Sequence, residues 1–156
     1  MRIERIDPTE LIASACERTA ILAERRNQLV ELQLDSSATV IDGDRQRLKQ
    51  VMVNLLSYLM RVTPVDSTLT IKAEVEIGEL QLAIKGGGRQ VSFEERESLF
   101  EPFFRSRNEV GQLQDSGLGL AIARALLRVA PWLGIAGEPG KRRKHFPCIT
   151  AARARL

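Results

Sequence analysis

Two glycines in the second half of the chain, Gly117 and Gly119, have the spacing of a turn that holds an anion. They follow a polar stretch, residues 104–116, and they open an apolar pattern with helical periodicity. Neither glycine has a Cβ, so the backbone can come close to a ligand, and the free N–H groups at a helix start attract negative charge. The segment therefore predicts a mobile lid that leads into a phosphate-binding turn.

A second group of candidate residues lies on a helix predicted over residues 44–62. Asn54, Tyr58 and Arg61 are spaced four and three residues apart, so they project from one side of that helix. This side is distinct from the apolar stripe, which consists of Leu48, Val51, Met52, Leu55, Leu56 and Leu59. We therefore expect one face of the helix to lie in the core and the other to face a ligand.

Helices and strands alternate along the chain, and hydrophobic periodicity together with capping residues defines their limits. Asp7 and Asp44 are the expected N-caps of the first two helices. We predict helices over residues 8–26, 44–62, 94–100 and 118–130, and strands over 30–34, 40–41, 69–75, 80–84, around 135 and over 146–152. This order predicts an α+β fold, a two-layer α/β sandwich with helices on one face of a mixed, mostly antiparallel sheet.

Composition fits one globular domain over residues 1–156, with 44% apolar and 28% charged residues. The chain shows no apolar signal-peptide core and no stretch near the roughly 18 apolar residues of a membrane span. Cys16 and Cys148 have no metal or disulfide spacing, and we expect Cys16 to be a small buried hydrophobe. A cytoplasmic location without direct membrane contact is therefore expected, and a membrane-tethered parent protein remains compatible with it.

Two sequence motifs carry a family resemblance. Leu-Phe-Glu-Pro-Phe-Phe-Arg (99–105) and Asp-Ser-Gly-Leu-Gly-Leu-Ala (115–121) resemble the F box and the second glycine box of the ATP-binding domain of sensor histidine kinases, within the GHKL ATPase superfamily. Residues 50–63 resemble the N box, so the resemblance covers nearly the whole chain and implies a Bergerat-type sandwich that binds ATP and Mg²⁺. By this resemblance the nucleotide-binding positions are Asn54, Arg61, Gly88, Arg105, Ser116, Gly117, Leu118 and Gly119.

Three positions depart from the family pattern, and all three belong to one pocket. Tyr58 stands where the N box has its second asparagine, Gly86 where the family has the aspartate that binds adenine, and Gln90 where it has a glycine. A phenol is a poor ligand for Mg²⁺, so we expect Tyr58 to pack its ring over a vacated site. No carboxylate lies between Glu79 and Glu94, and losing an acceptor for a buried donor costs about 1–3 kcal/mol.

The phosphoacceptor histidine that the resemblance implies is missing, because His145 is the only histidine and lies in a basic turn. We therefore assign no catalytic residue and no metal ligand, and expect the chain to be the C-terminal part of a longer two-component protein or to act on a partner. Expected partners are a histidine-bearing dimerisation domain, a response regulator or another kinase.

Two main functions remain open at this stage. One is a functional ATP-binding domain that transfers γ-phosphate to a histidine on a separate dimerisation domain. The other, favoured by the convergence of the three departures, is a pseudokinase or protein-interaction module with weak or no ATP binding. The basic residues from Lys141 to Arg155 raise a third possibility, nucleic-acid binding. The lack of interleaved aromatics makes it the weakest, and a solvated hairpin is expected there instead.

Overall fold

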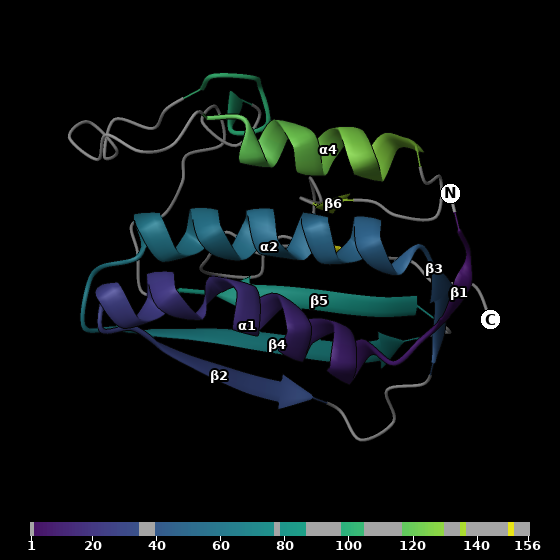
Figure 1. Ribbon diagram of the computed structural model, residues 1–156, viewed down its shortest axis with the longest axis horizontal. Coiled ribbons are helices and arrows are strands. Elements are labelled where there is room, and N and C mark those ends of the chain that lie inside the picture. Colours follow the sequence, from purple (N-terminus) through teal and green to yellow (C-terminus); the bar gives the residue numbers. More distant parts are fainter. Residues whose placement is uncertain are drawn as a thin grey trace.

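Helices form one layer of the molecule and a sheet forms the other (Figure 1). The computed structural model describes residues 2–34, 40–76, 79–86, 98–104, 117–129, 135–136 and 150–151. Within these ranges the helical layer consists of α1 (Pro8–Arg25), α2 (Arg45–Val62) and α4 (Gly119–Val129). Helices α1 and α2 run in the same direction, and α4 runs back alongside α2 (Figure 1).

The main sheet has the strand order β2-β4-β5-β7-β6. Its strands are β2 (Leu29–Leu34), β4 (Thr68–Glu76), β5 (Glu79–Lys85), β6 (Ile135–Ala136) and β7 (Thr150–Ala151). Strand β2 pairs parallel with β4, and the other neighbours pair antiparallel. The predicted mixed, mostly antiparallel sheet with helices on one face is confirmed.

A small second sheet joins β1 (Glu4–Ile6) to β3 (Ile41–Gly43). The sequence pattern indicated a strand near residue 41 but not β1, because three residues with two charges among them have no recognisable period. Ile6 pairs with Ile41, and both side chains are buried. The strand is therefore specified by its partner and by the core beneath it.

The core lies between the helices and one face of the sheet. Leu69, Ile71 and Ala73 of β4 are buried, whereas Lys72 between them is exposed. This alternation is expected for a sheet that is covered on one side. The predicted apolar stripe of α2 is buried throughout, at Leu48, Val51, Met52, Leu55, Leu56 and Leu59.

The first two helices begin where their caps predicted. The carboxylate of Asp7 accepts a hydrogen bond from the Thr9 N–H at 2.7 Å, and that of Asp44 accepts one from the Arg47 N–H at 3.2 Å. The N–H groups of Arg2 and Arg47 hold the pKa of Asp44 below its ordinary value. Both caps satisfy N–H groups that a helix start leaves without partners.

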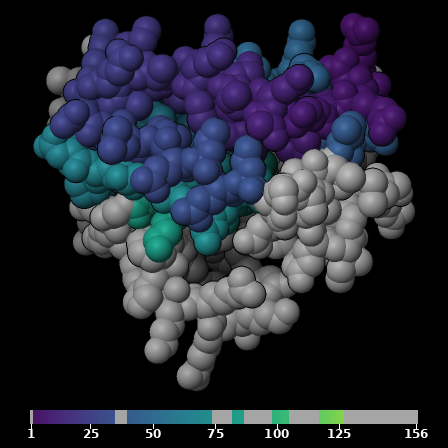
Figure 2. Space-filling view, turned by 90° about the horizontal axis from the view of Figure 1, so that it is seen from below, coloured from purple at the N-terminus to yellow at the C-terminus, as the bar shows by residue number. Residues whose placement is uncertain are grey.

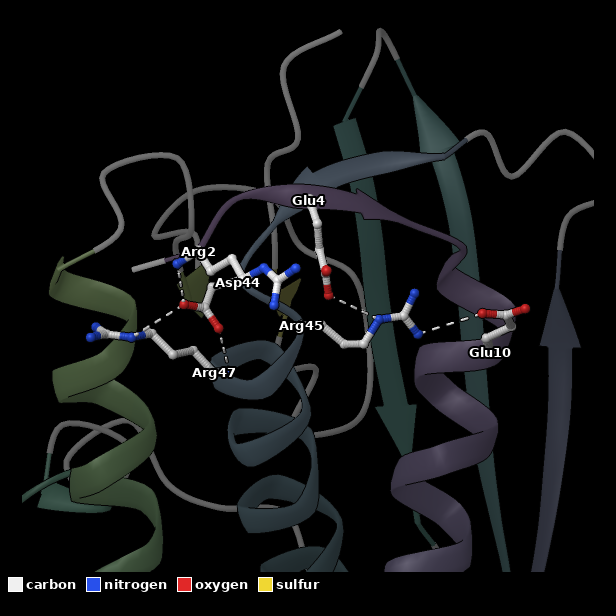
Figure 3. Close-up of polar contacts among 6 residues, drawn as sticks. All are labelled: Arg2, Glu4, Glu10, Asp44, Arg45 and Arg47. Atoms are coloured by element: carbon white, nitrogen blue, oxygen red, sulfur yellow. Dashed lines mark hydrogen bonds and ion pairs between the residues drawn. The ribbon is translucent and has the colours of Figure 1, made fainter.

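Polar contacts around the start of α2 connect three elements (Figure 3). The guanidinium of Arg45 lies between Glu4 of β1, at 3.2 Å, and Glu10 of α1, at 3.5 Å. The Arg2 N–H donates to Asp44 at 3.0 Å. The side chains of Arg45, Glu4 and Glu10 are partly solvent-accessible, so each ion pair contributes little, but together these contacts connect β1 and α1 to the beginning of α2.

Strand β2 forms one edge of the main sheet, and Figure 2 shows its surface side by side with that of α1. Leu29 is 68% exposed there. Glu31 and Gln33, on the same face of the strand as Leu29, are also exposed. A charged side chain such as Glu31 is one way in which native proteins keep an edge strand from pairing with another chain.

Some predicted features lie outside the described residues, including most of the helix at 94–100, most of the lid over 104–116, the turn at 138–141 and His145. Across the part of the chain that is described, no helix has the length and apolarity needed to cross a membrane. Cys16 is half-buried, and desolvation raises the pKa of its thiol.

Candidate functional site

The start of α4 lies against the middle of α2, which brings the second glycine box beside the N box. A Cβ built on Gly119 would lie 3.9 Å from both Cβ and Cγ of Asn54. The Oδ1 atom of Asn54 accepts a hydrogen bond from Gln50 Nε2 at 2.9 Å. Its Nδ2 atom is buried and has no hydrogen-bond partner among the described residues. The amide donor of Asn54 thus lies beside the N-terminus of α4, an eleven-residue helix.

Gly117 and Phe103 join the F box to the glycine box. The N–H of Phe103 donates to the carbonyl of Gly117 at 3.2 Å. A Cβ on Gly117 would lie only 3.0 Å from Phe103 Cα and 3.1 Å from the carbonyl oxygen of Phe104. Gly117 also has φ +67°, a left-handed conformation that strongly favours glycine. The two boxes therefore form one unit that glycine at 117 allows and that a larger residue there would strain.

The three phenylalanines of the F box have different environments. Phe100 and Phe104 pack against the hydrophobic core, whereas Phe103 is 72% exposed. Phe103 also has φ +65°, a sparsely populated conformation for a bulky residue. The backbone contacts with Gly117 hold Phe103 in this conformation, with its ring exposed to solvent.

Tyr58 and Arg61 follow Asn54 along α2 with the predicted spacing. Their burial, however, does not fit the expectation that all three side chains face a ligand from one side of the helix. Tyr58 is only 6% exposed and belongs to the core cluster. Arg61 is half-buried in the last turn of the helix. The burial of Tyr58 favours a ring that packs against its neighbours.

Gly86 follows directly after β5 and is buried against Thr63, the residue that caps the C-terminal end of α2. A Cβ on Gly86 would overlap Oγ1 of Thr63 and would lie 3.3 Å from both Cβ and Cγ2 of the same residue. Thr63 itself is 1% exposed. The sequence pattern singled out Gly86 but missed Thr63, because Thr-Pro after a helix indicates only where the helix ends.

The remaining predicted positions, Gly88, Gln90, Arg105 and Ser116, lie outside the described residues. Leu118 precedes the first residue of α4, and its carbonyl accepts from Ile122 N–H at 2.9 Å as the helix begins. Within the described ranges, no group of three or more His, Cys, Asp or Glu residues could hold a metal ion. The structure thus brings together Asn54, Gly117, Leu118 and Gly119, and separately Thr63 and Gly86.

Comparison with known proteins agrees with this arrangement. The family described as histidine kinase-, DNA gyrase B- and HSP90-like ATPases matches residues 43–146. The sensor protein DivL of Caulobacter vibrioides is 30% identical over 141 residues, which are 90% of this chain and 18% of DivL. The chain therefore spans about a fifth of that relative.

Solved structures share the fold. The catalytic domain of the histidine kinase ThkA has a TM-score of 0.71 at 24% identity, over 83% of this chain and 82% of that one. The mycobacterial sensor histidine kinase MprB has a TM-score of 0.73 at 24% identity, over 99% of each chain. With the F box joined to the glycine box and the glycine box set against the N box, the chain belongs to the GHKL ATPase family and has the fold of the catalytic domain of sensor histidine kinases.

Proposed function

We propose that this domain works in two-component signalling as a pseudokinase or protein-interaction module with weak or no ATP binding. The observation that carries the proposal is the contact between Gly86 and Thr63. The family places there the carboxylate that binds adenine, whereas here a Cβ on residue 86 would overlap Thr63 Oγ1. The residues present therefore do not fit the adenine end of the nucleotide.

The metal end of the pocket supports the same proposal. Tyr58 stands where the N box has an asparagine, and its ring is buried in the core cluster. Magnesium requires small oxygen ligands in octahedral geometry, which a buried phenol does not supply. Both departures act on one ligand, so their costs add at least in part.

Partners are proposed from the surface and from the relatives. Phe103, 72% exposed, and Ile122, 44% exposed, are apolar residues of the F box and α4. By family resemblance the F-box phenylalanines help to dock the lid on the helical domain that carries the phosphoacceptor histidine. ThkA has been solved in complex with the response regulator protein TrrA. We infer a cytoplasmic domain that contacts a dimerisation domain, a response regulator or another kinase.

The alternative is a functional ATP-binding domain that supplies γ-phosphate to a histidine elsewhere. It is favoured by the unpaired Nδ2 of Asn54 beside the start of α4, which would suit a phosphate group. Arg61 on the same helix could add positive charge. In that case ATP with Mg²⁺ would supply the phosphoryl group, and Asn54, Gly117 and Gly119 would bind and orient it.

Titration with a non-hydrolysable ATP analogue and Mg²⁺, followed by thermal unfolding, tests the proposal. A ligand that binds the native state must raise its stability. Because the proposal is weak or no binding, the melting temperature should stay unchanged up to about 1 mM of the nucleotide analogue. Lys72→Gln, an exposed change on the sheet that leaves Tyr58, Thr63 and Gly86 in place, is the control and should give the same flat response. Clear stabilisation of the wild-type domain below 1 mM would show that it is the alternative, a functional ATP-binding domain.

A further inference from the structure

We infer that Thr63 is a specificity-determining residue of this pocket, and that Arg26 and Gln28 are positioning residues that hold it against Gly86. The inference rests on the proposed function where it concerns nucleotide, although its structural part is independent of any ligand. In this chain the aspartate is missing, and in addition the packing of Thr63 against Gly86 closes the place that its side chain would need.

The backbone of Thr63 is held from both sides. Its N–H donates to the carbonyl of Leu59 at 2.9 Å. Its own carbonyl accepts from Gln28 Nε2 and from an Arg26 guanidinium nitrogen, both at 3.0 Å. Residues 26 and 28 follow α1, whose C-terminal end lies beside that of α2 (Figure 1).

Arg26 and Gln28 together form a clamp on the C-terminal end of α2, and Gln28 is its centre. It is 6% exposed, and its Nε2 atom lies 2.9–3.0 Å from the carbonyl oxygens of Met60, Thr63 and Pro64. Three acceptors around one atom fix the orientation of the amide, because a flipped amide would place its oxygen against three oxygens. Arg26 adds a hydrogen bond to the carbonyl of Arg61 at 3.2 Å.

This clamp limits how Thr63 can respond to a side chain at position 86. The backbone cannot retreat without breaking buried hydrogen bonds, so only rotation of the Thr63 side chain remains. Rotation removes the overlap with Oγ1, but the Cβ atom stays at 3.3 Å. Even one added methyl group at residue 86 therefore forces local repacking, and an aspartate needs more room than a methyl group does.

A ligand-free mutant cycle tests the structural part. Gly86→Ala should lower the melting temperature by roughly 3–10 °C in the wild-type background, and by less than half of that loss in the Thr63→Ala background. Gly119→Ala is the matched control, because its Cβ would make only ordinary contacts at 3.9 Å. Equal losses in both backgrounds would overturn the role of Thr63.

Two further variants keep this test decisive if Thr63→Ala folds poorly. Thr63→Ser removes Cγ2 and lets the hydroxyl turn away, so it should relieve part of the Gly86→Ala loss. Thr63→Val keeps the branched shape and should relieve none of it. Relief by the valine variant equal to that by the serine variant would contradict the inference.

The part of the inference that concerns nucleotide is tested by restoring the family's residues at positions 58 and 86. The variant Tyr58→Asn with Gly86→Asp should bind an ATP analogue with Mg²⁺ at least about tenfold more weakly than the same variant with Thr63→Ala added. Equal affinity of the two would overturn the inference and leave the proposed function standing. Tight binding by the wild-type domain would instead overturn the proposed function. The ligand-free mutant cycle would then still test the structural role of Thr63 independently.

Discussion

At both Gly117 and Gly86 a Cβ would meet neighbouring atoms, but the neighbours differ. At Gly117 they are backbone atoms, Phe103 Cα at 3.0 Å and the Phe104 carbonyl oxygen at 3.1 Å. At Gly86 they belong to one side chain, that of Thr63. Gly117 also has a left-handed φ of +67°.

This difference separates a glycine required by the fold from one that depends on a neighbour. No substitution elsewhere can move the backbone of Phe103 away from Gly117 without opening the joined F and glycine boxes. A smaller residue at position 63, in contrast, would make room at position 86. The junction of the F and glycine boxes is thus fixed by backbone atoms, whereas the packing beside Gly86 depends on the Thr63 side chain and on the hydrogen bonds from Arg26 and Gln28 that hold Thr63.

The largest effect is expected from Gly117→Ala. Left-handed backbone costs an alanine about 1–2 kcal/mol, and overlap with fixed backbone adds to it, so the free energy of unfolding should fall by about 2–4 kcal/mol. Urea unfolding measures this loss. Adding Phe103→Ala should not restore stability, because the overlapped atoms belong to the backbone; recovery of half the loss would remove the distinction between the two glycines.

Gln28→Met should come next. The substitution removes the amide whose two N–H groups face the carbonyls of Met60, Thr63 and Pro64, and it should lower the free energy of unfolding by about 1–3 kcal/mol. It should also weaken the coupling between residues 63 and 86, since the end of α2 could then shift. Gln50→Met, which removes an exposed amide bonded to Asn54, is the matched control. An unchanged coupling in the Gln28 variant would argue against the clamp.

Asp44→Ala tests the opposite end of α2 and should cost about 1 kcal/mol at neutral pH. Because the folded state lowers the pKa of Asp44, its contribution is present above the unfolded value of about 3.9 and is lost as pH falls through the lower folded pKa. The stability difference from wild type should therefore shrink at acid pH. Asp44→Asn keeps the cap and serves as the control.

The coupling between residues 63 and 86 should not change in the Asp44 variant. Its hydrogen bonds stabilise the start of α2, far from the clamp at the other end. A reduced coupling would mean that general loosening of the helix, rather than release of Thr63, explains the Gln28 result.

The smallest effect is expected from Gly119→Ala. Its Cβ would lie 3.9 Å from Asn54, and no left-handed φ is required, so stability should change by no more than about 0.5 kcal/mol. Thermal unfolding without ligand is sufficient to measure it. A loss as large as that of Gly117→Ala would show that the whole glycine box, and not Gly117 alone, is packed against backbone.

Long periodic elements were predictable, and short or non-local features were not. The stripe of α2 and its Asp44 cap depend on residues close in sequence, so their pattern already specifies the helix. Strand β1 and the position of Tyr58 in the core cluster depend on what lies across from them. The expectations for Gly88, Gln90, Arg105 and Ser116 remain predictions.

The sequence by itself determined the fold class, the family motifs and the absence of a carboxylate between Glu79 and Glu94. These are properties of residue type and local spacing. Only the tertiary structure decided what lies beside Gly86, because the exit of β5, the cap of α2 and the turn after α1 meet there. Contacts between segments so far apart arise from packing, and no local pattern encodes them.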